Sequence, residues 1–418
     1  MRILLVVEEL GYRGTPRTVA NLATILSPRH DVLIWGWRQG GPLVERLEKK
    51  GFKVLVGKDA IGTALLFKPD VVNFHRDGWG YPQETEILKQ FREQGAKCIE
   101  TNVFGRVDPH SAKLFDVSIQ ISLWDLYRWN AWKGGLNLPG VYCPYPVDIN
   151  EFKRSPENEI RQMRRSWGLD DGQIAPFVLG RIGKTTWSYV EDSLLVALDT
   201  YPNLHVVSVD DYGGKGMPVR LRGHPRVHIC DKMLDSTELS RFYSACDACL
   251  NMNQTGESFG FVNAESMACG TPVIALSNPL HDNAQMEMLG HGKGGVLISD
   301  PCELPSALRM CIEDRAFYQN LKAHARGLIV DRYSFQEVEH IYEKLFECLQ
   351  KDDVRQAISG AARSGELVLD VPRREILTML QASVGKISFW KLLAMRLLHT
   401  PLGYRLIRLA AKCRKVLR

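Results

Sequence analysis

Short runs of consecutive apolar residues recur along the chain and alternate with segments of helical periodicity. The first series reads ILLVV, DVLIWGW, KVLVG, DVVNF, KCIETNV, FDVSIQIS and VYCPY, and the second reads FVLGRIG, HVVSVD, RVHIC, ACLNMN, PVIALS and GGVLIS. Continuous apolar runs indicate strands that are buried on both faces, as in a parallel sheet. Helical stretches such as PLVERLEKKG and STELSRFYSAC lie between strands, so the pattern predicts doubly wound α/β structure.

The two series are separated by a charged stretch, EFKRSPENEIRQMRR, that begins at Glu151. The chain has 418 residues, and single hydrophobic cores stop growing near ~250–300 residues. We therefore expect two Rossmann-like domains, over residues 1–150 and 151–350, facing each other across a cleft, with a helical extension over 351–418. Ligands of such sheets bind beyond the carboxyl ends of the strands.

Composition and cysteine usage are those of an ordinary reduced protein. The net charge is +5, which favours anionic ligands only weakly, and ten cysteines show no disulfide or metal-binding framework. No secretory leader or apolar run near ~20 residues is visible. We therefore expect a cytoplasmic protein without a bound metal or cofactor, and without a nucleic-acid partner.

The stretch ESFGFVNAESMACGTPVIAL, residues 257–276, carries the strongest chemical signal. It sets Glu257 and Glu265 eight positions apart across a Ser-Phe-Gly turn. A short helix over 261–269, closed by Gly270, and the buried strand PVIAL follow the turn. Backbone amides at the start of this helix would offer a site for an anion or a sugar hydroxyl, with two carboxylates beside it.

This stretch resembles the donor-binding signature of retaining glycosyltransferases of the GT-B fold, family 4, in which seven residues separate two glutamates. The resemblance implies that Glu257 contacts hydroxyls of the donor sugar and that Glu265 holds the nucleotide ribose. It also implies that the backbone of the intervening turn approaches the sugar and the phosphates. The donor-binding residues of that turn would be Ser258, Phe259, Gly260 and Phe261.

Two further loops resemble the same family. ELGYRGTPR resembles its Gly-rich first loop, whose amides face the donor phosphate or the acceptor, so Gly14 is a donor-binding candidate on the opposite wall of the cleft. GRIGKTTWS resembles its Arg-and-Lys loop, so Arg181 and Lys184 would bind the donor diphosphate and stabilise the charge that develops as the glycosidic bond breaks. Lys184 lies slightly earlier than the lysine of the family.

The sequence also departs from the family. Many members carry a histidine after the fifth strand of the first domain, whereas this chain has Asn102 there. His75, after the strand DVVNF, is a second candidate in the cleft. Asn102 and His75 are therefore candidate contacts of the acceptor or the sugar. The segment YPVDINEF, over 145–152, resembles the interdomain hinge of the family.

The tail beyond residue 350 lies outside the resemblance. Residues 386–418 hold nine basic side chains and no acidic one. Arg405, Arg408, Lys412 and Lys415 recur at helical spacing, beside an apolar stripe of Leu402, Leu406, Leu409 and Val416. The pattern is that of a basic amphipathic helix on an anionic membrane or of a helix docked on its own protein.

These observations predict an enzyme that transfers a hexose from a nucleotide-sugar, UDP- or GDP-linked, to a glycan or lipid-linked acceptor. The resemblance implies retention of configuration and a place in the synthesis of cell-surface polysaccharide or glycoconjugate. Two other functions stay open. One is a nucleotide-sugar epimerase of the same fold, and the other is a catalytically silent partner subunit that binds a nucleotide or a glycan.

Overall fold

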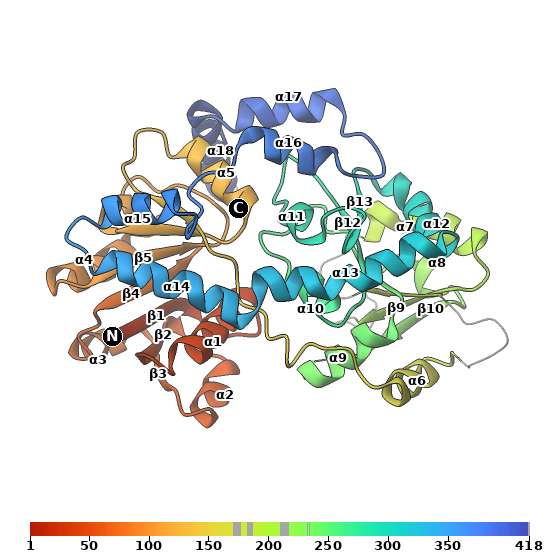
Figure 1. Cartoon of the computed structure of the whole chain (residues 1–418), viewed down its shortest axis with the longest axis horizontal. Coiled ribbons are helices and arrows are strands. Elements are labelled where there is room, and N and C mark those ends of the chain that lie inside the picture. The colour runs from red at the N-terminus through yellow and green to blue at the C-terminus, as the bar shows by residue number, and fades with distance from the viewer. Residues whose placement is uncertain (170–176, 182–186, 210–216, 232, 234, 417–418) are drawn as a thin grey trace. The chain divides into compact units, whose positions relative to one another are not determined.

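The computed structural model (Figure 1) describes the chain apart from residues 170–176, 182–186, 210–216, 232, 234 and 417–418. The chain forms two compact units. The first unit comprises Met1–Pro146, Phe335–Arg373 and Leu393–Arg418, and the second comprises Val147–Ser334 and Arg374–Leu392. Among the described helices, none combines the length and the apolar character that a membrane span requires.

The first unit is built on a seven-stranded parallel sheet with the order β3-β2-β1-β4-β5-β6-β7. Its strands are β1 (Arg2–Glu9), β2 (Asp31–Gln39), β3 (Lys53–Val56), β4 (Val71–Arg76), β5 (Lys97–Asn102), β6 (Val117–Gln120) and β7 (Gly140–Tyr142). Its helices are α1 (Gly14–Leu26), α2 (Leu43–Lys49), α3 (Ile61–Leu66), α4 (Pro82–Glu93), α5 (Leu123–Trp132), α14 (Phe335–Leu349), α15 (Val354–Arg363) and α18 (Pro401–Val416).

The second unit is built on a six-stranded parallel sheet with the order β10-β9-β8-β11-β12-β13. Its strands are β8 (Phe177–Arg181), β9 (Leu204–Val209), β10 (Val227–Cys230), β11 (Ala248–Asn251), β12 (Val273–Leu276) and β13 (Gly295–Ile298). Its helices are α6 (Glu157–Ser166), α7 (Trp187–Thr200), α8 (Val219–Arg222), α9 (Ser236–Ala245), α10 (Phe261–Ala268), α11 (Gln285–Leu289), α12 (Leu304–Ile312) and α13 (Arg315–Tyr333).

Every apolar run that predicts a strand forms one, so the two doubly wound sheets are confirmed. The central strands are buried on both faces, with burial extending through all six residues of β4 and all four of β12. The strands β3 and β10, each at an edge of its sheet, are partly exposed. Helices cover both faces of the first sheet. Apolar residues of α1 and α14 pack in one core cluster and those of α4 and α5 in another.

The boundaries of the units differ from the predicted 1–150, 151–350 and 351–418. The first boundary lies between Pro146 and Val147, close to its predicted place. Residues 335–350 belong to the first unit instead of the second, because α14 buries Val338, Leu345 and Phe346 in the first core. The extension is not separate either. Residues 374–392, with most of α16 (Arg373–Gln381), belong to the second unit, and 393–418 belong to the first.

Candidate functional site

The order of the strands in the second sheet reverses between β8 and β11. From β8 the chain goes to β9 and β10 on one side, and from β11 it goes to β12 and β13 on the other. Cys249 of β11 pairs with Gly180 of β8, so the two strands end within one residue of each other, at Asn251 and Arg181. Such a reversal leaves a crevice at the carboxyl ends of parallel strands, which is where open α/β sheets bind ligands.

Arg181 lies at this edge as the last residue of β8. Its Nη1 donates to the carbonyl oxygen of Val209 at 3.2 Å and lies 3.5 Å from the Ser208 hydroxyl. The guanidinium carbon lies 4.9 Å from the centre of the Trp187 ring, at the start of α7. These contacts hold a cation at the predicted place. Lys184, the second predicted cation, lies outside the described residues.

Glu257 lies in the loop that follows β11, and several polar groups fix its position. Its Oε1 accepts hydrogen bonds from the side-chain amides of Asn251, at 3.3 Å, and Asn253, at 3.2 Å. Its backbone N–H donates to Gln285 Oε1 at 3.3 Å, and its carbonyl oxygen accepts from the Ala284 N–H at 2.9 Å. The carboxylate is thus partly exposed and held in place from both sides.

Two glycines make this loop conformation attainable. Gly260 has φ 86° and ψ 64°, in the left-handed region that favours glycine. A β-carbon there would lie 3.0 Å from Asn263 Nδ2 and 3.3 Å from Glu257 Cβ. Gly256 has φ 72°, and a β-carbon there would collide with the backbone oxygen of Asp282. Packing is therefore close on both sides of Glu257, against the Asp282 backbone at Gly256 and against side chains at Gly260.

The helix that the sequence predicts over 261–269 is α10, Phe261–Ala268, and Gly270 ends it with φ 79°. No side chain caps its N-terminus, and its first turn carries no acidic residue. Phe259 is buried and packs its ring against Phe261, with centroids 5.0 Å apart. Ser258 is partly exposed before it. The positive end of the α10 dipole thus lies beside Glu257, where it favours an anionic or hydroxyl ligand.

Glu265, on α10, lies in a different environment from Glu257. Its side chain is buried, and Oε2 accepts a hydrogen bond from the Tyr243 hydroxyl at 3.1 Å. Tyr243 itself is fully buried on α9. This contact fixes the carboxylate on the side of α10 that faces α9, and its role toward a ribose stays a prediction.

The structure brings Glu257 together with side chains that sequence reasoning missed. Asn251 and Asn253 immediately follow an apolar run, and this position at the end of a buried strand is a signal that could have identified them. Gln285 and Tyr243 carry no such signal, because they lie 28 residues after Glu257 and 22 residues before Glu265. Only the folded loop shows that they orient the two glutamates.

In the first sheet the strand order reverses between β1 and β4. Gly14 is exposed as the first residue of α1, which follows β1 and has no side-chain cap. His75 lies next to the end of β4, and neither ring nitrogen has a hydrogen-bond partner among the described residues. Burial lowers the pKa of His75 to about 3, so the imidazole is neutral. His75 thus lies near the end of β4 and Gly14 follows the end of β1, and these two strands flank the reversal.

Asn102, the other candidate in the first unit, is engaged in its own loop. Its Nδ2 donates to the carbonyl oxygen of Arg106 at 2.6 Å, and its Oδ1 accepts from the Arg106 N–H at 3.2 Å. The side chain is fully buried. These bonds close the turn after β5, and a contact between Asn102 and a sugar stays a prediction.

A buried cluster of charges beside this turn was also missed. Arg76 Nε lies 3.5 Å from Glu84 Oε2 and 3.4 Å from Glu100 Oε1, and Arg76 Nη2 lies 3.4 Å from Asp108 Oδ2. Burial raises the pKa of Glu84 to about 8, against the attraction of Arg76. Three carboxyl groups around one guanidinium cannot all ionise cheaply, and burial raises the pKa of both Glu84 and Glu100. No cluster of side chains suited to a metal ion occurs among the described residues.

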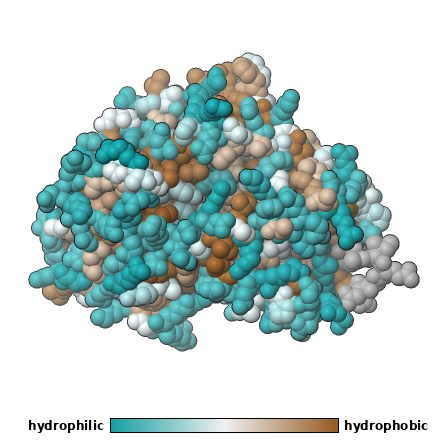
Figure 2. Space-filling model, viewed as in Figure 1, coloured by the Kyte–Doolittle hydropathy of each residue, from teal (hydrophilic) through white to brown (hydrophobic). Residues whose placement is uncertain are grey.

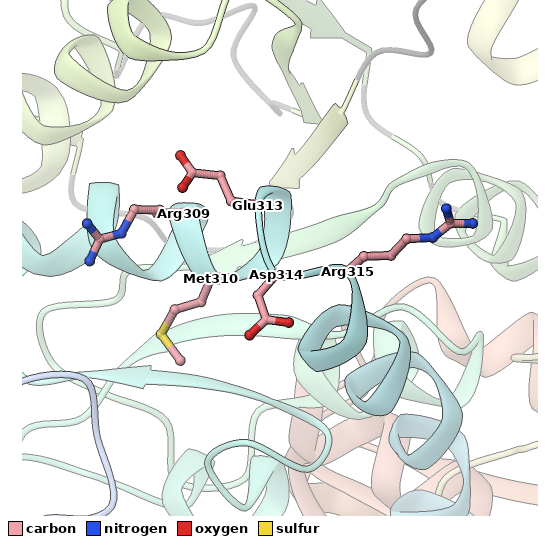
Figure 3. A pocket seen from close by; sticks show the side chains of 5 residues that line it. All are labelled: Arg309, Met310, Glu313, Asp314 and Arg315. Carbon is pink, nitrogen blue, oxygen red and sulfur yellow. The ribbon is translucent and has the colours of Figure 1, made fainter.

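A shallow surface depression lies away from these residues, where α12 meets α13. Its volume is about 410 Å³, and Arg309, Met310, Glu313, Asp314 and Arg315 line it. Figure 3 shows the Arg309 and Arg315 side chains extending in opposite directions, so their charges do not converge on a ligand. The depression contains none of the predicted site residues.

Comparison with known proteins relates part of the second unit to a family of enzymes. Residues 177–314 match the family model of the glycosyl transferases group 1. The chain is 27% identical over 298 residues to the phosphatidyl-myo-inositol mannosyltransferase of Mycolicibacterium smegmatis. The aligned residues make up 68% of this chain and 70% of that relative. The segment that matches the family model lies within the second unit.

Solved structures share the architecture of the chain. Anabaena HepE in complex with UDP-glucose superposes with a TM-score of 0.67 at 19% identity, over 83% of this chain and 99% of HepE. A glycosyltransferase from Rickettsia africae superposes with a TM-score of 0.67 at 15% identity, over 84% of this chain and 99% of the other. At these identities the likeness concerns the fold, which is GT-B.

Proposed function

We propose that the chain is a glycosyltransferase that moves a sugar from a UDP- or GDP-linked donor to a glycan or lipid-linked acceptor, with retention of configuration. The observation that carries the proposal is that the second sheet reverses its strand order where β8 and β11 meet, with Arg181 at the end of β8 and Glu257 in the loop after β11, hydrogen-bonded to Asn251. This meeting point lies inside the segment that matches the group 1 glycosyltransferases. The names of the relative and the UDP-glucose complex of HepE support the same class of substrate.

The donor diphosphate would bind at the ends of β8 and α10. Arg181 supplies a positive charge that is fixed by Val209 and Trp187, and α10 supplies a helix N-terminus without a side-chain cap. Lys184 would add a second cation. The leaving group gains negative charge as the glycosidic bond breaks, so preorganised positive groups stabilise the transition state more than the ground state. In this proposal they neutralise the diphosphate without a resident metal.

The donor sugar and ribose would be oriented by the two glutamates. Glu257 presents a carboxylate that Asn251 and Asn253 hold in one position, which suits it to accept hydrogen bonds from sugar hydroxyls. The turn through Ser258, Phe259, Gly260 and Phe261 places backbone close to the same hydroxyls. Glu265, fixed by Tyr243, would bind the ribose.

The acceptor would bind to the first unit, near the ends of β1 and β4. A neutral imidazole can accept a hydrogen bond from an acceptor hydroxyl, and His75 is neutral with both ring nitrogens buried. Gly14 and the start of α1 would lie beside it, and Asn102 is a further candidate contact through its loop. We also propose that the enzyme acts in the cytoplasm, in the synthesis of cell-surface glycoconjugates. The cytoplasmic location is consistent with the nine cysteines of the described residues, which are all free thiols.

Incubation of the protein with UDP- and GDP-sugars, with and without glycan or lipid acceptors, tests the proposal. A transferase releases the nucleoside diphosphate and slowly hydrolyses the donor without acceptor. An epimerase of this fold would return an isomerised donor, and a silent binding subunit would leave every donor intact. Either of these two outcomes would contradict transfer.

Glu257→Gln tests the role of the carboxylate. The change keeps the shape but replaces one acceptor oxygen with an amide donor, so turnover should fall on the order of 10²-fold or more. Affinity for the nucleoside diphosphate should change little, because the sugar contacts alone are altered. Glu238→Gln, at an exposed glutamate of α9 in the same unit, is the control. Near-normal turnover in Glu257→Gln would remove this residue from the site.

A further inference from the structure

Large apolar side chains are concentrated on the surface of the last two helices, α17 (Phe389–Leu398) and α18. Six of the twelve exposed large hydrophobic residues among the described residues lie in these helices. They are Phe389, Trp390, Leu397, Leu402, Leu406 and Leu409, each 58–74% exposed. Figure 2 shows hydrophobic side chains at the top edge of the view, over α17. A soluble surface rarely gathers apolar residues in this way without a function.

These side chains share faces of their helices. Leu402, Leu406 and Leu409 follow spacings of four and three residues, so they form one stripe along α18, and exposed Arg405 lies within it. On α17, Trp390 and Leu397 are seven residues apart and lie on the same side. We call the residues Leu397, Leu402, Leu406 and Leu409 the outer stripe.

The opposite face of α18 is docked on the first unit. The Tyr404 hydroxyl accepts from the Val107 N–H at 2.8 Å and donates to the Val107 carbonyl at 2.9 Å. The Tyr404 ring stacks on Trp132 with centroids 4.7 Å apart, and Trp132 Nε1 donates to the Leu398 carbonyl at 3.0 Å. The helix is therefore folded and held in one orientation, and the outer stripe faces away from the protein.

The charge around the outer stripe has one sign. Residues 386–418 contain nine lysines and arginines and no acidic residue. Among the described side chains of this segment, Lys386, Arg396 and Arg405 are exposed. Apolar side chains flanked by basic ones match an anionic membrane, whose acyl region accepts the leucines and whose headgroups attract the cations. A second copy of the same surface would bring like charges together, which disfavours self-association.

We propose that the outer stripe is a membrane-binding surface that seats the protein on an anionic lipid bilayer, with the apolar side chains in the interface and the basic ones at the phosphates. The docked face of α18 holds this surface in place, so the helix does not have to fold when it meets the bilayer. The inference is independent of the sugar chemistry, because none of these residues belongs to the donor or acceptor site.

Vesicle co-sedimentation of the full chain tests the proposal. We expect binding to phosphatidylcholine vesicles that contain phosphatidylglycerol, weak binding to pure phosphatidylcholine, and a steep fall with salt. Leu402→Ser/Leu406→Ser/Leu409→Ser should reduce binding by about 100-fold or more, since each leucine loses a buried apolar side chain. Arg396→Glu/Arg405→Glu should reduce it by about 25-fold or more, at roughly fivefold for each of the two cations lost.

The control is Val56→Ser/Leu66→Ser/Val368→Ser, which removes three exposed apolar residues elsewhere in the first unit. It should bind vesicles as the unchanged protein does. Melting temperature and nucleotide affinity show whether each variant is folded. The proposal is overturned if the unchanged chain ignores anionic vesicles, or if the leucine variant binds them equally well. It is also overturned if the unchanged chain is a dimer that this variant dissociates, because the stripe would then be a protein interface.

Discussion

Gly260→Ala should damage activity far more than stability, and Gly270→Ala provides a matched comparison. The two glycines lie at opposite ends of α10 with similar backbone angles, φ 86° and φ 79°. Either change places an L-residue in the left-handed region, at a cost of roughly 1–2 kcal/mol. Only at Gly260 does the new β-carbon meet neighbours, because nothing lies within 4 Å of it at Gly270.

The neighbours of Gly260 are the groups that orient the site. The added carbon would lie 3.0 Å from Asn263 Nδ2 and 3.3 Å from Glu257 Cβ, so these atoms must retreat by a few tenths of an ångström. The bonds that hold the Glu257 carboxylate are already 3.2–3.3 Å long, near the limit for a hydrogen bond. A charge-assisted bond of this kind contributes about 1.5–3 kcal/mol. A misplacement of ~1 Å at a reacting centre can cost ~10²-fold in rate.

We therefore expect Gly260→Ala to lower turnover by about tenfold to 100-fold and Gly270→Ala to change it by less than about threefold, with comparable losses of unfolding free energy. Release of nucleoside diphosphate from the donor measures turnover, and thermal unfolding measures stability. The reasoning fails if both variants lose turnover equally. It also fails if Gly260→Ala, shown to be folded, turns over at the normal rate.

Two more predictions concern buried charges. Arg181→Ala should weaken binding of a nucleoside diphosphate by about 2 kcal/mol or more and leave the affinity for the bare nucleoside unchanged. Calorimetry measures both affinities, with Arg220→Ala, at an exposed arginine, as the control. An equal loss of affinity for both ligands would assign Arg181 a structural role. Burial raises the pKa of Glu84 to about 8, so the protonated carboxyl favours the folded state. The contribution of Glu84 to stability is therefore present at low pH and is lost as the pH rises through that value. Melting temperature should therefore fall between about pH 4.5 and pH 8 more steeply in the unchanged protein than in Glu84→Gln, with exposed Glu86→Gln as control. Parallel curves for the unchanged protein and Glu84→Gln would contradict this.

The strands could be predicted because burial on both faces leaves a continuous apolar run, and no other common element has this pattern at that length. The membership of α14 could not be predicted. Its apolar stripe of Val338, Tyr342 and Leu345 shows that one face is buried but does not identify the sheet that it covers. The hydrogen bond from Asn73 Nδ2 to the Tyr342 hydroxyl, 3.2 Å long, joins residues 269 positions apart. Pairings over such distances leave no local trace in a sequence.

The loop that contains Glu257 was predictable for a similar physical reason. Glycine is required where φ is positive, so Gly256, Gly260 and Gly270 mark the bends around α10 in the sequence itself. The amides of Asn251 and Asn253 are different, because their contact with Glu257 depends on the path of the loop. The charge cluster around Arg76 depends in the same way on the fold, since its carboxyl groups come from separate elements.

The tail shows a question that helical periodicity alone does not decide. A helix with one apolar stripe can dock on protein or lie on lipid, and the sequence offers these as alternatives. In α18 two faces are apolar for different reasons. Tyr404 and Ile407 pack in the first core, whereas Leu402, Leu406 and Leu409 point outward. Docking and membrane binding are therefore compatible, and docking makes membrane binding easier. A free helix of this length is only marginally stable in water. The docked helix is already folded, so membrane binding does not have to supply the free energy of helix formation.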